Sequence, residues 1–133
     1  MRVPLLTFLA CAALLACDSG PSTAADVAGV YVQVSQNGVG IPGGGVQSGF
    51  LELKPDGTLS AEWVIDRPFA GEGLRDTTTT SGSFTLGAYR RGCLSVSVHL
   101  ESEPEEPGAG TLCDDRLALV GGRDTLVFLL RQQ

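Results

Sequence analysis

Alternation of apolar and polar residues over short segments is the feature that most restricts the fold of this chain. In segment 94–100, leucine and valine occupy every second position, and serine and His99 occupy the positions between them. A period of two is typical of a strand that buries one face. No segment keeps a helical period, and turn residues recur every 8 to 12 residues or so. The sequence therefore predicts an all-β fold, a small antiparallel meander barrel or sandwich of about seven to eight strands.

The clearest turn lies at Pro55-Asp56-Gly57, between two alternating runs. Proline presets φ for a turn, aspartate tolerates the next position, and glycine accepts a positive φ. These residues predict a β-hairpin between 50–54 and 58–65. Its buried face would hold Leu51, Leu53, Leu59, Ala61 and Trp63.

Further strands are predicted from β-branched and alternating runs at 28–34, 77–80, 82–87, 117–120 and 124–130. Glycine, proline and acidic residues predict loops at 36–45, 67–76 and 101–110. The run 124–130 is apolar on both faces, so we expect it to lie inside the sheet or to close it.

The first 17 residues differ in kind from the rest of the chain. Arg2 precedes an uncharged, apolar run over 3–16, and Leu14-Leu15-Ala16-Cys17 ends it. The run has about 14 residues, which is shorter than the roughly 18 to 20 of a transmembrane helix. A charged start, an apolar centre and a small residue before the cut are typical of a signal peptide. The terminal four residues resemble the lipobox of bacterial lipoproteins; the alternative is an ordinary secretory signal in which the cysteine has no role.

The lipobox resemblance implies that a signal peptide of 1–16 is removed and that Cys17 receives diacylglycerol and a further fatty acid such as palmitate. Membrane lipid would then be the partner of the acylated Cys17. The small polar residues of 17–25 predict a flexible tether, and 26–133 is long enough for a single domain. The implied location is the bacterial cell envelope, and the resemblance does not distinguish the periplasmic face of a membrane from the cell surface.

Two cysteines, Cys93 and Cys113, remain once Cys17 is assigned to lipid and Cys11 to the signal peptide. An oxidising compartment favours a disulfide between them. A metal pair and free thiols are the alternatives. Because a metal needs more ligands and His99 is the only histidine, a metal site is disfavoured.

Three segments carry the pattern of the domain: Ala28-Gly29-Val30-Tyr31, the hairpin of 51–58, and Gly82-Ser83-Phe84-Thr85-Leu86. Together they resemble the small lipocalin-like and related β-barrel domains of exported bacterial lipoproteins. The resemblance implies a barrel that encloses a ligand pocket. Full lipocalins are longer and place a tryptophan near the first strand, whereas the single tryptophan here is Trp63, two predicted strands later.

Composition and motifs restrict the chemistry. The formal net charge is −6, and loss of Arg2 with the signal peptide makes it more negative. Such a domain does not neutralise phosphates, so we expect no nucleic-acid partner, and no run of basic residues is present to bind an anionic lipid surface.

Segment 38–43 has the letters of a dinucleotide-binding glycine motif, but no helix pattern follows it, so it predicts a loop and no cofactor.

Candidate catalytic residues are few. His99 shares the polar face of its strand with Ser95 and Ser97, and a hydrolase would need a base, a nucleophile and an orienting acid to converge there. The glutamates of 101–106 and the pair Asp114-Asp115 lack the spacing of a calcium loop and predict solvated turns.

We therefore expect a membrane-anchored, non-catalytic binding or interaction domain. Its partner would be a small apolar ligand inside the barrel or an envelope protein at the glycine-rich loop 38–45. The alternatives are a structural or stress-related lipoprotein without a ligand and, least favoured, a hydrolase.

Overall fold

The computed structural model describes residues 22–43, 45–66, 75–104 and 107–131. Within them the chain forms one short helix and a nine-stranded antiparallel sheet. The elements are α2 (Ala24–Val27), β1 (Gly29–Gln36), β2 (Val39–Gly40), β3 (Val46–Leu53), β4 (Thr58–Asp66), β5 (Arg75–Arg90), β6 (Cys93–Leu100), β7 (Gly108–Cys113), β8 (Arg116–Gly121) and β9 (Asp124–Leu130).

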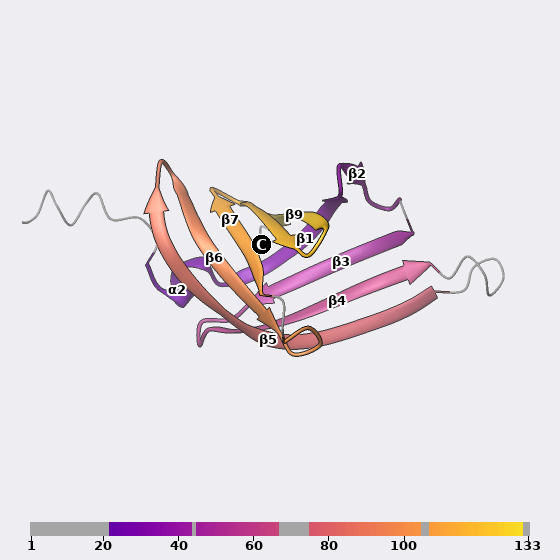
Figure 1. The fold of residues 1–133 in the computed structure, drawn as a ribbon, viewed down its shortest axis with the longest axis horizontal. Helices are drawn as coiled ribbons and strands as arrows, with labels where there is room; N and C mark the ends of the chain where they lie inside the picture. The colour runs from indigo at the N-terminus through magenta and orange to yellow at the C-terminus, as the bar shows by residue number, and fades with distance from the viewer. Residues whose placement is uncertain (1–21, 44, 67–74, 105–106, 132–133) are drawn as a thin grey trace, which may run out of the picture.

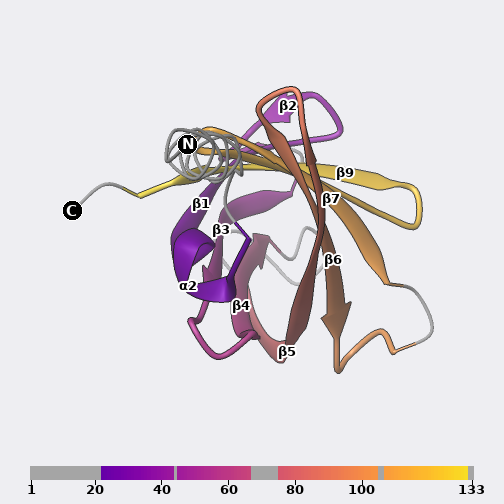
Figure 2. The ribbon, with the colours of Figure 1, turned by 90° about the vertical axis from the view of Figure 1, so that its left-hand side faces the viewer.

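The sheet closes on itself. Strands β3 to β9 pair with their neighbours in chain order, and β1 pairs with both β3 and β9. Eight strands therefore form a closed barrel, and β2 extends beyond it as a short extra strand on β1. Figure 1 shows β3, β4 and β5 side by side, with β4 running away from α2 and β3 and β5 running back toward it, and Figure 2 shows the strands arranged around a common axis with α2 at the near end. The predicted all-β meander is confirmed in its barrel form.

The predicted hairpin at Pro55-Asp56-Gly57 is confirmed. Gly57 has a φ of 88°, and its amide donates to the carbonyl of Lys54 (3.1 Å). Asp56 accepts hydrogen bonds from the hydroxyl and the amide of Thr58, and these hydrogen bonds lower the pKa of the Asp56 carboxyl. The turn thus holds its own conformation by local hydrogen bonds.

Three predicted boundaries are wrong, each for a physical reason. Segment 36–45 is not wholly a loop, because Asn37 (φ 51°) and Gly38 (φ 81°) make a two-residue turn that pairs β1 with β2. The runs 77–80 and 82–87 are parts of one continuous strand, β5, which already begins at Arg75; residues 67–74 lie outside the described residues. The predicted loop 101–110 is too long, because β7 already begins at Gly108. The two glycines of this strand interrupt the alternation that would have predicted it.

The barrel interior follows the predicted alternation. Leu51, Leu53, Leu59 and Ala61 are buried as predicted, whereas Trp63 is half-buried. Strand β6 buries Leu94, Val96 and Val98 and exposes the residues between them, as predicted. Strand β9 pairs with β8 on one side and β1 on the other, so the doubly apolar run does close the sheet.

The α2 end of the barrel is capped. Thr23 and Asp26 form a capping box at the start of α2, which begins two residues before the expected start of the domain at residue 26. Val27 is buried, and its carbonyl accepts a hydrogen bond from the hydroxyl of buried Tyr31 (2.7 Å). Burial, and secondarily the negative charge of Asp115, raises the pKa of Tyr31.

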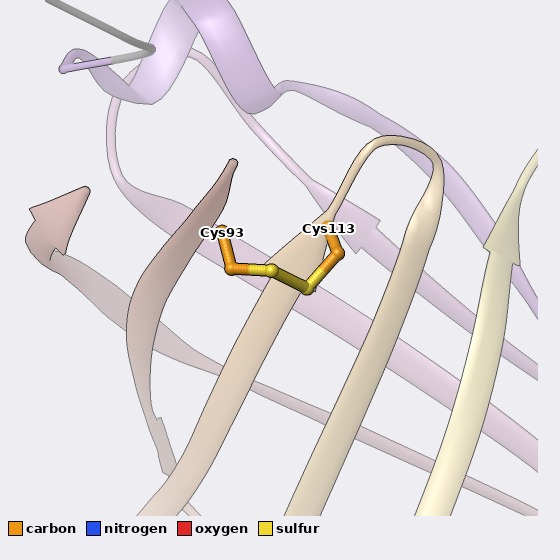
Figure 3. The surroundings of a disulfide bond; sticks show 2 residues. All are labelled: Cys93 and Cys113. Atoms are coloured by element: carbon orange, nitrogen blue, oxygen red, sulfur yellow. A yellow bond between two sulfur atoms is a disulfide. The ribbon is translucent and has the colours of Figure 1, made fainter. Parts of the chain in front are cut away.

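The predicted disulfide between Cys93 and Cys113 is present, with an S–S distance of 2.08 Å (Figure 3). The two cysteines are direct partners in the ladder between β6 and β7. The disulfide therefore links two strands that are already neighbours, close to the turn that leads into β8 (Figure 3).

Replacing Tyr31 by phenylalanine tests the capped end. We expect Tyr31→Phe to lower the free energy of unfolding at pH 7 by about 1 kcal/mol, because the Val27 carbonyl loses its partner. Above the ordinary tyrosine pKa of 10.0, the unfolded chain loses the phenolic proton before the folded chain does, so native stability falls as pH rises through the raised pKa. The free energy of unfolding, measured by urea denaturation between pH 7 and 11, should fall less with rising pH in Tyr31→Phe than in the native chain.

The exposed Tyr89 provides the matched control, because it is 42% exposed. In Tyr89→Phe, the free energy of unfolding should fall with rising pH as steeply as it does in the native chain. An identical pH dependence in native and Tyr31→Phe chains would contradict the assignment.

Candidate functional site

The end of the barrel opposite α2 contains a half-enclosed cavity of about 490 Å³. It lies where β1, β4, β6 and β8 end and where β3, β5, β7 and β9 begin. Its lining residues combine an apolar set, Val46, Leu51, Trp63, Ile65, Val98, Leu100, Leu119, Leu126 and Phe128, with a polar and glycine set, Gln36, Gly45, Thr78, Thr80, Ser102, Glu103, Gly108, Gly121 and Asp124. The cavity is thus the part of the interior that the core side chains leave open.

Four buried residues form the floor of the cavity: Leu51, Val98, Leu119 and Phe128. They come from β3, β6, β8 and β9, which are four of the eight barrel strands. Two glycines, Gly108 and Gly121, leave space on β7 and β8 where side chains would otherwise project. An eight-stranded barrel is just wide enough either to fill with side chains or to hold one small ligand. In this chain the α2 half is filled, and the opposite half is open.

The wall of the cavity contains a buried polar contact. Gln33 is 3% exposed and is the only buried polar side chain among the described residues. Its Oε1 accepts a hydrogen bond from Trp63 Nε1 (2.9 Å), and its Nε2 donates to the carbonyl of Ser35 (3.3 Å). A buried amide is costly unless both ends are satisfied. The contact therefore fixes the indole of Trp63 at the edge of the cavity.

Gly49 makes room for this contact. It lies opposite Trp63 in the ladder between β3 and β4. A Cβ on Gly49 would overlap Gln33 Oε1 and lie 2.9 Å from Cδ1 of Trp63. Sequence reasoning missed Gln33 and Gly49, because a glutamine in a strand and a glycine near a hairpin carry no pattern of their own. Trp63, the single tryptophan in the sequence, was the only residue of this contact that the sequence alone could point to.

The rim of the cavity is polar and is held in place by the turn between β1 and β2. Asn37 Nδ2 donates to Asp124 Oδ1 (2.9 Å), and Asn37 Oδ1 accepts from the amide of Thr125 (2.8 Å). The Asn37 amide also donates to the carbonyl of Thr125 (2.8 Å). These bonds tie the Asn37-Gly38 turn to the start of β9. Thr78, Thr80, Ser102 and Glu103 complete the rim with groups that could bind the polar end of a ligand.

The predicted catalytic candidates lie elsewhere. His99, Ser95 and Ser97 are exposed on the outer face of β6, outside the cavity. On the same outer surface, Glu101 accepts a hydrogen bond from Ser81 Oγ (3.0 Å). The structure does not place these four residues in a cleft, which catalysis by a Ser-His-acid set requires.

The remaining predicted features are distributed over the molecule. The glycine-rich motif 38–43 lies in the β1–β2 hairpin and the turn after it, and the next described element is the strand β3. Of the acidic residues, Glu103 lies on the cavity rim, whereas Asp114 and Asp115 line a smaller cavity of about 190 Å³ beside α2. Cys17, Glu105 and Glu106 lie outside the described residues.

Comparison with protein-family models, curated proteins and solved structures finds no match to the chain. Among the described residues, no group of three or more histidine, cysteine, aspartate or glutamate side chains is arranged to hold a metal ion. The same residues include no helix with the length and apolarity needed to cross a membrane.

Replacing Gly49 by alanine tests the wall of the cavity. The added methyl group must displace the Gln33 amide or the Trp63 ring, so we expect a loss of about 1 to 3 kcal/mol in the free energy of unfolding. The indole should also become more mobile, which lowers its fluorescence anisotropy. Gly121→Ala is the matched control, because nothing lies within 4 Å of its added Cβ. Equal stability of both variants would show that Gly49 is not needed for this contact.

Proposed function

We propose that the protein is a non-catalytic binding domain of the bacterial cell envelope that holds a small apolar molecule in the mouth of its barrel. The observation that carries this proposal is the apolar, half-enclosed cavity of about 490 Å³. Ligand pockets in proteins have volumes of about 300 to 1,000 Å³ and combine apolar walls with a few polar groups. The cavity meets both criteria, with an apolar floor, polar groups at its rim, and the Nε1 of Trp63 in its wall already bonded to Gln33.

The chemistry of the lining defines the class of ligand. Leu51, Val98, Leu119 and Phe128 offer only dispersion contacts and exclude water from the body of the ligand. Hydroxyls at Thr78, Thr80 and Ser102 could hydrogen-bond one polar end. A small molecule with an apolar body and at most one polar end fits this arrangement best.

The proposed location rests on the N-terminal sequence. The run 3–16 and Leu14-Leu15-Ala16-Cys17 are consistent with export, cleavage and acylation of Cys17. The Cys93–Cys113 disulfide supports export, because disulfides persist in oxidising compartments. Two or more acyl chains on Cys17 would give stable membrane attachment.

The binding test uses Trp63 as the reporter, because its ring lines the cavity and it is the only tryptophan. Bromobenzene is a neutral apolar probe whose heavy atom quenches indole fluorescence on contact. With the full chain in lipid nanodiscs, we expect saturable quenching of Trp63 by bromobenzene. Gly121→Phe should weaken this binding at least about tenfold, because the new ring enters open space inside the cavity.

Thr111→Phe is the matched control, since it adds the same ring on the exposed face of β7. This variant should bind bromobenzene as the native chain does. Quenching that rises linearly without saturation, or that is equal in native and Gly121→Phe chains, would favour a structural lipoprotein without a ligand.

A further inference from the structure

The outer surface of β1, β9 and β8 exposes an apolar face. Six outward residues form what we term the valine face: Val32, Val34, Ala118, Val120, Val127 and Leu129. Val34, Val120 and Leu129 are 36%, 50% and 44% exposed. Barrel closure explains why the inward residues of these strands are apolar, but it gives no reason for an apolar outer face. Apolar residues gathered on one outer face, rather than scattered singly, are typical of an interaction surface.

The strand register joins four residues of the valine face in two apolar pairs, whereas Val120 pairs with Thr125, and Val127 also pairs with Ser35. Val32 pairs with Leu129 across β1 and β9, and Val127 pairs with Ala118 across β9 and β8. Val34 lies at the irregularity between Gln33 and Ser35, where β1 shifts its register against β9. Cross-strand partners are about 4.5 to 5.5 Å apart at Cβ, so these side chains contact one another.

Charge is distributed unevenly around the barrel. Strands β1, β8 and β9 contain a single carboxylate, Asp124, which accepts a hydrogen bond from Asn37 at the cavity rim. Exposed carboxylates begin on the neighbouring wall, at Glu52 of β3 and Glu62 of β4. The valine face is therefore free of carboxylates in a chain of net charge −6.

Two arginines border the valine face at its α2 end. Arg116 pairs with Leu129, and Arg131 follows β9 with its amide bonded to the carbonyl of Val30 (2.7 Å). Arg116 and Arg131 lie far apart in the sequence, so no basic run predicted this pair. The adjacent Asp114 and Asp115 line the small cavity beside α2. Cations next to exposed apolar side chains are the combination that binds an anionic lipid surface.

The described chain begins at this same end. Asp26 and Val27 of α2 line the small cavity together with Leu130, the neighbour of Arg131. Six residues lie between Cys17 and Ala24, so the Cα atoms of these two residues are at most about 25 Å apart. If Cys17 is anchored as proposed above, the α2 end with its two arginines is held near the bilayer.

We infer that the valine face docks on an anionic lipid bilayer, with Arg116 and Arg131 contacting lipid phosphates. This inference rests on the lipid anchor of the proposed function. The acidic wall of β3 and β4 then lies beside the docked face and not on it. A second copy of the chain is a poorer occupant, because the nearest exposed carboxylates, Asp114 and Asp115, lie in the turn before Arg116 and the valine face itself has none.

The test is photo-crosslinking from defined positions of the full chain. The chain is purified from bacterial membranes and reconstituted in phosphatidylcholine vesicles with or without phosphatidylglycerol. Benzoylphenylalanine replaces Val120 or Leu129 on the valine face, or the exposed Thr79 of β5 as the matched control. We expect several-fold more lipid adduct from positions 120 and 129 than from position 79, and more with phosphatidylglycerol than without it.

A pair of charge variants tests the role of the arginines. Arg116→Gln with Arg131→Gln should reduce lipid adducts on phosphatidylglycerol vesicles to the level on neutral vesicles. Arg90→Gln with Arg91→Gln removes the same charge from the β5–β6 turn, which lies at the α2 end but on the wall opposite β9, and should change little.

The outcomes separate the two proposals. Vesicle flotation of the chain with equal adducts from positions 79, 120 and 129 would overturn the docking face and leave the anchor intact. Crosslinks between two chains at positions 120 and 129 would replace the bilayer by a second copy. A native chain that fails to float with vesicles at all would overturn the anchor and the docking together.

Discussion

The antiparallel pairing of β1 with β9 is the contact on which the cavity and the outer surface both depend. It joins the first long strand to the last one, so that eight strands share a single interior. Without it, the apolar side chains of β9 would lie on an unprotected edge, where strands pair with other chains. The closure buries Phe128 and places Leu126 in the cavity wall. It also brings Val32 next to Leu129 on the outside.

Inside the barrel, the two ends have different packing and therefore different roles. Val27 and Tyr31 close one end, and leucines from several strands fill the space beneath them. At the other end, Gly108 and Gly121 have no side chains to fill the space. The hydrogen bond between Gln33 and Trp63 holds the indole at the cavity wall. The filled end gives the domain its core, and the open apolar end is where we propose that a ligand binds. Docking of the valine face would also bring the β8–β9 edge of the mouth close to the lipid from which an apolar ligand could enter.

Local patterns predicted much of this fold, and the gaps have identifiable causes. The turn at Pro55-Asp56-Gly57 and the alternation of β6 act over a few residues, so the sequence shows them directly. Strand β7 was missed because its glycines suppress the alternation signal. The disulfide followed from cysteine number and compartment, and the structure confirms it. The Gln33–Gly49–Trp63 contact and the Arg116–Arg131 pair depend on strand register, which one sequence does not reveal.

The central claim is that the barrel mouth encloses empty apolar space able to hold a ligand. Crystals of the full chain under xenon pressure test this claim most directly, because xenon enters dry apolar cavities and scatters X-rays strongly. The account predicts xenon density bordered by Val98, Leu119 and Phe128. Side chains filling that space, with no xenon between them, would contradict it.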